Sequence, residues 1–208
     1  MDLNSIQQKL KKHSPSVLGS KAFSKYAVLL PLIQKTDDIH VLFEVRSHKM
    51  RRQPGEICFP GGRMDPQDKT DQDTAVRETT EELGISAKQI TDVFPLDFLV
   101  SPFGMMIYPH AGLIHDPESV QPNPSEVDEV FEVPLSFFLN NPPQVHYVHA
   151  RMEPETGFPH ELLPGGRNYN WHPRKIDELF YVYGDKVIWG LTAKILTHFV
   201  ELIGKEQG

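Results

Sequence analysis

Three glutamates crowd into the segment RETTEELGI, residues 77–85, which otherwise has the character of a helix. On a helix, residues three and four apart are neighbours, so Glu78 faces both Glu81 and Glu82. Each like-charged pair costs a helix roughly 0.2–0.5 kcal/mol. A hard divalent cation such as Mg²⁺ prefers oxygen ligands and would turn this repulsion into coordination. The alternative interpretation is a solvated acidic face in which Arg77 forms an ion pair with Glu81.

A helix over residues 72–83 is expected to carry these carboxylates. Either Thr70 or Asp71 can cap its N-terminus, and Gly84 suits the left-handed position that ends it. At ~100° per residue, one side of this helix can pack on a sheet, and we expect the three glutamates on the other side to face outward. The residues on the packing side are Val76, Thr79 and Leu83.

A glycine turn and an acidic loop precede the helix. The segment ICFPGG indicates a short strand that stops at Gly61 and Gly62, and Asp65 and Asp68 follow in a polar loop. These segments bring backbone carbonyls and further carboxylates to the start of the helix. Divalent ions held there would neutralise phosphate groups and generate hydroxide near neutral pH. The arrangement therefore indicates hydrolysis of a phosphoryl or pyrophosphate bond.

The segment GRMDPQDKTDQDTAVRETTEELGI (62–85) resembles the Nudix box, the signature of hydrolases that cleave a nucleoside diphosphate linked to another moiety. Its second half is complete, whereas Asp68 stands where glutamate is usual and one extra residue follows it. This departure is typical of the coenzyme A diphosphatases. The segment LFEVRSHKMRRQPGEICFPGG (42–62) resembles that subgroup's second signature, although Phe43 and Glu44 replace the usual leucine and threonine.

The resemblance implies a Nudix α/β/α sandwich with a mixed β-sheet, and a reaction that uses Mg²⁺ or Mn²⁺. Glu78 and Glu82 would be the principal metal ligands, and Glu81 would be a further ligand or the base, held by Arg77. The implied reaction cleaves the diphosphate bond of coenzyme A or its derivatives, releasing 3′,5′-ADP and 4′-phosphopantetheine or its acyl form.

The stretch RSHKMRR, residues 46–52, is a local basic anomaly in a chain of net charge −7. A polar loop between strands is the simplest alternative. Guanidinium groups match phosphate oxygens bidentately, and coenzyme A carries a 3′-phosphate besides its diphosphate. By resemblance, Arg46 and Arg51 bind substrate phosphates, and which arginine meets which phosphate stays open. Gly61 and Gly62 would line the same site, with the Gly61 carbonyl also offered to the metal.

Two further glutamates follow the QPNP turn. Nudix enzymes often take a base or an additional metal ligand from such a downstream loop, so Glu126 or Glu129 could serve, and Glu126 is favoured because it lies closer to the turn. The alternative is a solvated strand entry. Cys58 is interpreted as a small buried residue and not as a nucleophile, because no assisting base is identifiable.

The remaining pattern favours an α/β sandwich with a mixed sheet. Residues 26–33 and 40–47 are expected to form a hairpin-like pair of strands, and residues 134–140 a short helix. The last helix carries Trp189 through Ile203 at helical spacing, with Trp189 in the core. Further strands are predicted at 93–100, 106–114, 127–133, 144–150 and 178–183.

Length and composition favour one domain over residues 1–208, with a short N-terminal extension at 1–22. The negative net charge argues against nucleic-acid or membrane-surface binding, and the single cysteine excludes an internal disulfide. We expect a cytoplasmic protein with a small-molecule substrate and, as a possible assembly, a homodimer. The rival functions are a Nudix enzyme for another dinucleotide, such as ADP-ribose or NADH, and a Nudix-like regulator that binds a nucleotide without cleaving it.

Overall fold

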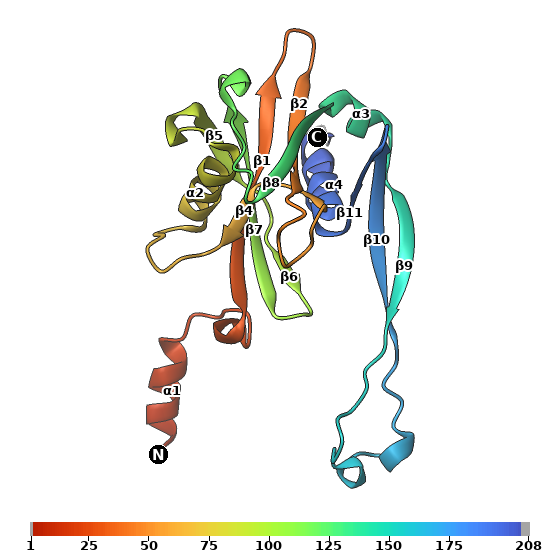
Figure 1. The fold of residues 1–208 in the computed structure, drawn as a ribbon. Coiled ribbons are helices and arrows are strands. Elements are labelled where there is room, and N and C mark those ends of the chain that lie inside the picture. The colour runs from red at the N-terminus through yellow and green to blue at the C-terminus, as the bar shows by residue number, and fades with distance from the viewer. Residues whose placement is uncertain (1, 205–208) are drawn as a thin grey trace.

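A mixed sheet with helices on both faces forms the body of the protein in a computed structural model that describes residues 2–204 (Figure 1). Its eight strands are β1 (Ser24–Gln34), β2 (Ile39–Arg46), β3 (Ile57–Cys58), β4 (Gly61–Arg63), β5 (Ile90–Pro95), β6 (Leu99–Ser101), β7 (Met105–Ile114) and β8 (Val127–Pro134). A second sheet holds β9 (Gln144–Ala150), β10 (Arg174–Tyr183) and β11 (Lys186–Trp189). The α-helices are α1 (Leu3–Lys11), α2 (Asp71–Leu83), α3 (Leu135–Asn140) and α4 (Gly190–Gly204).

The path of the large sheet is β3-β2-β1-β7-β5, with β1 and β7 parallel and the other pairs antiparallel. This order confirms the predicted mixed sheet and the hairpin between β1 and β2. Strand β4 pairs with the first part of β1, where Val28 lies opposite Gly61, and β8 pairs with β2. Gly61 and Gly62 were predicted to stop a strand, but they begin β4, which lies directly on the central strand. We keep the name glycine turn for these two residues.

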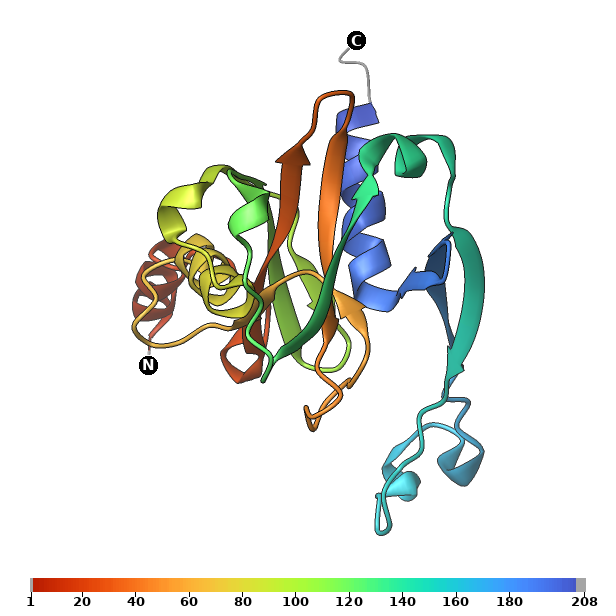
Figure 2. The ribbon, with the colours of Figure 1, turned by 45° about the horizontal axis from the view of Figure 1, so that its top comes forward.

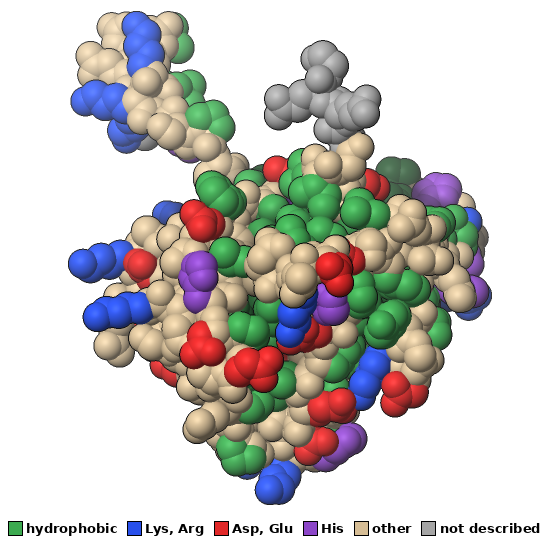
Figure 3. Space-filling view, turned by 90° about the horizontal axis from the view of Figure 1, so that it is seen from above, with side chains coloured by type: hydrophobic (Ala, Val, Ile, Leu, Met, Phe, Trp, Pro, Cys, Tyr) green, Lys and Arg blue, Asp and Glu red, His purple; other side chains and the backbone are tan. Residues whose placement is uncertain are grey.

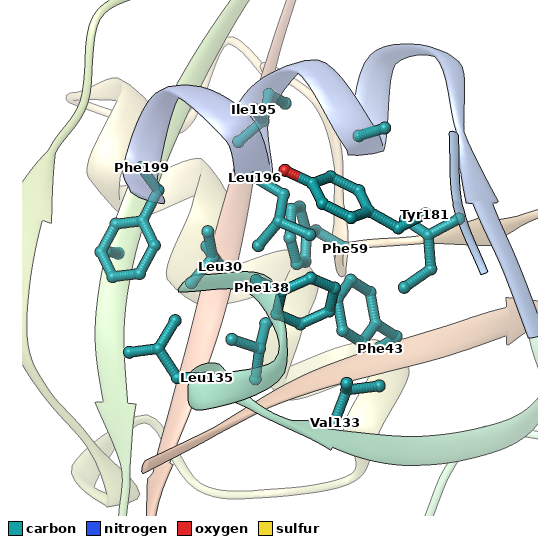
Figure 4. Packing of buried hydrophobic residues seen from close by; sticks show 14 of the residues in the cluster. Leu30, Phe43, Phe59, Val133, Leu135, Phe138, Tyr181, Ile195, Leu196 and Phe199 are labelled. Atoms are coloured by element: carbon teal, nitrogen blue, oxygen red, sulfur yellow. The ribbon is translucent and has the colours of Figure 1, made fainter. Parts of the chain in front are cut away.

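Each face of the sheet has its own core. Strand β1 alternates, so that Leu30 packs towards α4 while Leu29 packs towards α2, and both are fully buried. On the α4 side, Phe43 stacks on Phe59 with ring centroids 5.1 Å apart, and Phe138 closes the cluster (Figure 4). Burying a side chain of this size contributes roughly 1.5–3 kcal/mol to the free energy of unfolding, so these contacts help to hold β2 and the segment after β3 together.

An arm formed by β9 and β10 extends beyond the body, and residues 151–173 form its tip (Figures 1 and 2). Trp171 packs edge-on against both Phe158 and Tyr169 at this tip. Helix α1, which buries none of its residues, also stands off the body. On the face seen in Figure 3, basic, acidic and hydrophobic side chains are interspersed, as on an ordinary solvated surface.

Three further predicted elements differ from the structure. The predicted strand 93–100 is two strands, β5 and β6, because the register on β7 shifts at Asp92, whose φ is 50°, and the chain leaves the sheet after Pro95. Strand β10 begins four residues before the predicted 178. Trp189 was wrongly placed in a buried helix: it ends β11, is 41% exposed and stacks on Phe180.

Candidate active site

Helix α2 begins and ends where its sequence directs. The Thr70 side chain accepts from the backbone of Asp73, and the Asp73 carboxylate accepts from the backbone of Thr70, forming a capping box. Gly84 ends the helix with φ 64°. The helix packs on β1 and β4, with Ala75 and Leu83 in the core. This packing fixes the position of its glutamates beside the glycine turn.

Both glycines of that segment lie in close approach to a neighbour, and only at Gly61 is that neighbour backbone that cannot move aside. Gly61 has φ 155°, and a side chain there would collide with the backbone of Ala27 and Val28. A Cβ on Gly62 would overlap the carboxylate of Glu78. The Glu78 carboxylate therefore lies directly against the backbone of the turn.

Arg77 is the centre of an outer cluster that also contains Asp68, Glu78 and Glu81. Its guanidinium donates to both Asp68 oxygens, at 3.0 and 2.9 Å. It also lies 3.0 Å from Glu78 Oε1 and donates to Glu81 Oε2 at 3.2 Å. These hydrogen bonds hold the pKa of Asp68 well below its usual range. Asp68, which stands where glutamate is usual in the Nudix box, thus holds the Arg77 side chain in place.

Glu82 does not face outward, so that expectation was wrong. Only 4% of it is exposed, and its Oε2 accepts from the backbone N–H of Gly61 at 2.7 Å. The packing side of α2 is wider than predicted, because it includes Ala75 and brings Glu82 against the sheet. Burial is the largest cause of the raised pKa of Glu82, and the nearby charge of Glu44 is the second largest.

Glu44 is a buried glutamate that the sequence interpretation missed as a site residue. It is 1% exposed, and its Oε1 accepts from the Cys58 thiol at 3.2 Å. Burial raises the pKa of Glu44 and also that of Cys58, which keeps the thiol protonated. We refer to Glu44 and Glu82 as the inner pair. A charged residue within the apolar strand HVLFEV was the signal that could have revealed it.

The basic loop and the downstream glutamate meet at the end of β2. The backbone N–H of Ser47 donates to the Glu126 carbonyl at 2.8 Å, which places Glu126 beside Arg46. The charge of Glu126 contributes to the raised pKa values of Glu44, Glu78 and Glu82.

The two arginines of the basic loop differ in exposure, and the second downstream glutamate lies in an ion pair. The Nε of Arg46 is buried without a hydrogen-bond partner, whereas Arg51 is exposed in the loop. Glu129 is engaged elsewhere, by Lys186 at 2.6 Å.

The donor set fits a hard divalent cation in its chemistry. It consists of carboxylate oxygens, Arg46 is a cation whose charge acts on Glu44, and one buried oxygen of Glu44 has no partner. In this side-chain arrangement, no group of three acidic, histidine or cysteine residues within 2–204 converges to hold a metal. Glu78 and Glu81 are instead held by Arg77, and Glu82 by Gly61.

The comparison with known families decides the identity of this arrangement. Residues 24–156 match the NUDIX domain. The chain belongs to the Nudix family. Nudix hydrolases generally use divalent metal ions, in agreement with the oxygen-rich cluster.

The relatives of this Nudix protein include coenzyme A diphosphatases, of which one mouse and one human protein serve as examples. The peroxisomal coenzyme A diphosphatase NUDT7 of Mus musculus is 43% identical over 124 residues, which are 60% of this chain and 52% of that protein. The mitochondrial coenzyme A diphosphatase NUDT8 of Homo sapiens is 31% identical over 180 residues, 85% of this chain and 68% of the relative. The chain thus spans about half the length of the mouse relative.

The same fold occurs in a solved structure, that of a MutT/nudix family protein from Enterococcus faecalis. The TM-score is 0.52 at 16% identity, over 99% of this chain and 71% of the other, which shows a shared fold alone. The predicted α/β fold class is thereby confirmed. None of the helices in residues 2–204 has the length and apolar character needed to span a membrane. The single-domain organisation, the homodimer and the cytoplasmic location stay predictions.

Proposed function

We propose that this Nudix protein hydrolyses the diphosphate bond of coenzyme A or its derivatives, releasing 3′,5′-ADP and 4′-phosphopantetheine or its acyl form. One observation carries the proposal. Arg46 holds a buried Nε without a partner at the edge of the carboxylate cluster, next to Glu126. An unpaired buried donor beside a cluster suited to cations needs an anionic group to complete it.

Mg²⁺ or Mn²⁺ would be held by Glu78 and Glu82, with Glu81 and the Gly61 carbonyl as further donors. When bound, the cation supplies charge neutralisation of the diphosphate and an activated water. Arg77 fixes the outer carboxylates in place. Glu126, whose carbonyl is tied to Ser47, is the proposed base, because its charge reaches Glu44, Glu78 and Glu82 while Glu129 is paired with Lys186.

The basic loop supports coenzyme A over other dinucleotides. Coenzyme A carries a 3′-phosphate in addition to its diphosphate, and Arg51 is an exposed cation on the loop that follows Arg46. The glycine turn at Gly61 and Gly62 would lie along the bound diphosphate. The names of the mouse and human relatives support the same substrate class. A pyrophosphatase for ADP-ribose is the second candidate, and a regulator that does not cleave is the third.

The test compares kcat/KM for coenzyme A and 3′-dephospho-coenzyme A in the wild type, Arg46→Ala and Arg51→Ala. A charge-assisted guanidinium–phosphate contact is worth roughly 1.5–3 kcal/mol, so its loss is expected to cost about one to two decades in kcat/KM. The preference for coenzyme A over 3′-dephospho-coenzyme A should shrink in the variant that lacks the arginine bound to the 3′-phosphate. Arg151→Ala, on the exposed start of the arm tip, is the matched control for a lost positive charge.

The rival functions give different results in the same assay. Equal kcat/KM for the two coenzyme A forms in the wild type means that the loop does not read the 3′-phosphate. A much higher kcat/KM for ADP-ribose than for coenzyme A supports the second candidate, a pyrophosphatase for ADP-ribose. Binding without cleavage of any of these compounds supports the regulator.

A further inference from the structure

Glu44 occupies an unusual position for a carboxylate. It lies two residues before the end of β2, opposite Cys58 of β3 and Val130 of β8, and is 1% exposed. Its Oε1 accepts from the Cys58 thiol, but its Oε2 is fully buried and has no hydrogen-bond partner. A thiol is a weak donor, so this single bond offsets little of the cost of burying the carboxylate.

The fold itself has no use for a charge at this position. Leu42, two residues before Glu44 on β2, is a buried apolar residue, and the partner of Glu44 on β8, Val130, is apolar. Leaving a buried polar group unsatisfied costs about 1–3 kcal/mol, and more when the group is charged. An apolar or hydroxyl side chain would fill the site at lower cost, so the carboxylate is expected to serve a ligand.

The groups around Glu44 define what that ligand must be. Arg46 lies two residues further along β2, just past a shift in the register with β8, and its Nε also lacks a partner. These two residues do not satisfy each other, although their charges interact. Glu82 from α2 and Glu126 from the loop before β8 complete the surroundings, and both are negative.

The Glu44 carboxylate also lies close to the glycine turn. Cys58, which contacts Glu44, stands three residues before Gly61, and Gly61 donates to Glu82 at 2.7 Å. The two glutamates of the inner pair are thus bonded to the two ends of one short segment, residues 58–61. The unpartnered oxygen is therefore part of the acidic cluster and not an isolated core defect.

We propose that Glu44 supplies its free carboxylate oxygen to the divalent-cation site, from the sheet side, so that glutamates of both β2 and α2 hold the metal. Carboxylates are the protein groups that Mg²⁺ and Mn²⁺ select. The inference rests on the proposed function, because it assumes that the acidic cluster binds metal. The subgroup signature has threonine at this position, so the additional ligand is a property of this chain.

The experiment measures Mn²⁺ binding, by calorimetry and by electron paramagnetic resonance, in the full chain without substrate. Glu44→Gln keeps the shape of the side chain and removes its charge. We expect the Mn²⁺ dissociation constant to rise by at least about 10-fold, in the range reported for groups that support a metal site. We also expect the melting temperature of the metal-free protein to rise, because a buried charge is removed.

Two further variants separate a ligand from a structural residue. Cys58→Ala removes the thiol and keeps the carboxylate, so Mn²⁺ affinity should match the wild type. Glu44→Thr introduces the residue usual in the subgroup and should weaken Mn²⁺ binding as Glu44→Gln does. It provides a second test if the Glu44→Gln variant does not fold.

The failure of this inference is distinguishable from failure of the proposed function. If Glu82→Gln loses Mn²⁺ while both Glu44 variants bind it like the wild type, Glu44 is not a ligand and the hydrolase proposal stands. If the Glu44 variants lower the metal-free melting temperature with unchanged Mn²⁺ affinity, Glu44 is structural. A wild type that binds no Mn²⁺ overturns both proposals.

Discussion

The carboxylates around helix α2 fall into an outer cluster and an inner pair, and the chain treats their charges in opposite ways. In the outer cluster, the Arg77 guanidinium contacts Asp68, Glu78 and Glu81 at 2.9–3.2 Å. In the inner pair, Glu44 and Glu82 accept from only a thiol and a backbone N–H. The outer charges are paired with a guanidinium, although burial still raises the pKa of Glu78, whereas the inner charges have no such partner.

This difference separates the part of the site that is pre-organised from the part that is left incomplete. Arg77 and Asp68 form a bidentate pair that needs no ligand, and it lowers the pKa of Asp68. Burial raises the pKa of both members of the inner pair, and the charge of Glu44 raises that of Glu82 further. A bound cation would gain most of its attraction from the inner pair, and the outer cluster would keep the geometry fixed.

Glu82→Gln is expected to have the largest effect on activity. It removes a proposed ligand and should lower kcat by at least about 100-fold, the upper range for loss of groups that only support a metal site. The metal-free protein should stay folded and gain stability, because the buried repulsion with Glu44 is relieved. Steady-state rates at saturating Mg²⁺ and thermal unfolding without metal check both parts.

The control for this prediction is Glu118→Gln, which removes an exposed carboxylate outside the cluster. It should leave both the rate and the melting temperature unchanged. Wild-type turnover by Glu82→Gln in saturating Mg²⁺ would remove Glu82 from the proposed ligands.

Arg77→Gln tests the outer cluster and should affect stability and activity together. Asp68, Glu78 and Glu81 all lose their contact with the guanidinium, so we expect a loss of about 1–3 kcal/mol in the free energy of unfolding and about 10- to 100-fold in kcat. Arg77→Lys should recover only part of both, because an ammonium cannot make the bidentate contact with Asp68. Urea unfolding and initial rates give the two values. Unchanged stability in Arg77→Gln would mean that the outer charges are satisfied by solvent.

The sequence predicted the outer cluster better than the inner pair, for a physical reason. Arg77, Glu81 and the capping residues act over one helical turn, so their relations follow from spacing alone. The burial of Glu82 depends on how closely β4 approaches α2, and that of Glu44 on the pairing of β2 with β3 and β8. These are contacts between distant segments, which the periodicity of one helix does not contain.

The same contrast holds for the fold. Strands β1, β2, β7, β8 and β9 followed from β-rich runs of sequence. The break between β5 and β6 did not, because it depends on a positive φ at Asp92 and on the register with β7. Trp189 fitted the helical spacing of α4 but pairs with Phe180 in a strand. In both places a local pattern was overruled by pairing with another segment.

The stability of the metal-free protein should depend on pH through the inner pair. The folded-state pKa of Glu82 lies above its ordinary value of 4.5, so the folded state binds more protons and stability falls as pH rises above that value. One such proton contributes at most about 1.4 kcal/mol per pH unit. His110, whose pKa is lowered by burial, acts in the opposite direction below its ordinary value of 6.5. Thermal unfolding from about pH 5 to about pH 8 records the sum.

Glu82→Gln isolates the share of the inner pair in this pH dependence. The variant retains His110, so the difference between the two curves belongs to the inner pair and to the groups that face it, Glu78, Glu126 and Arg46. The wild type should lose stability relative to Glu82→Gln as pH rises. Parallel curves would show that Glu82 titrates normally in the folded protein.

The smallest effect is expected for Glu81→Gln, measured as the free energy of unfolding. The Glu81 side chain is 55% exposed and lies one helical turn from Arg77, and exposed pairs at this spacing contribute only about 0.3–0.5 kcal/mol. A double-mutant cycle of Arg77→Gln and Glu81→Gln should return a coupling energy of that size, decreasing at high salt. A larger, salt-insensitive coupling would mean that Glu81 shares the buried character of the inner pair. The boundary between compensated and uncompensated charge would then lie between Glu78 and Glu81, not between Glu81 and Glu82.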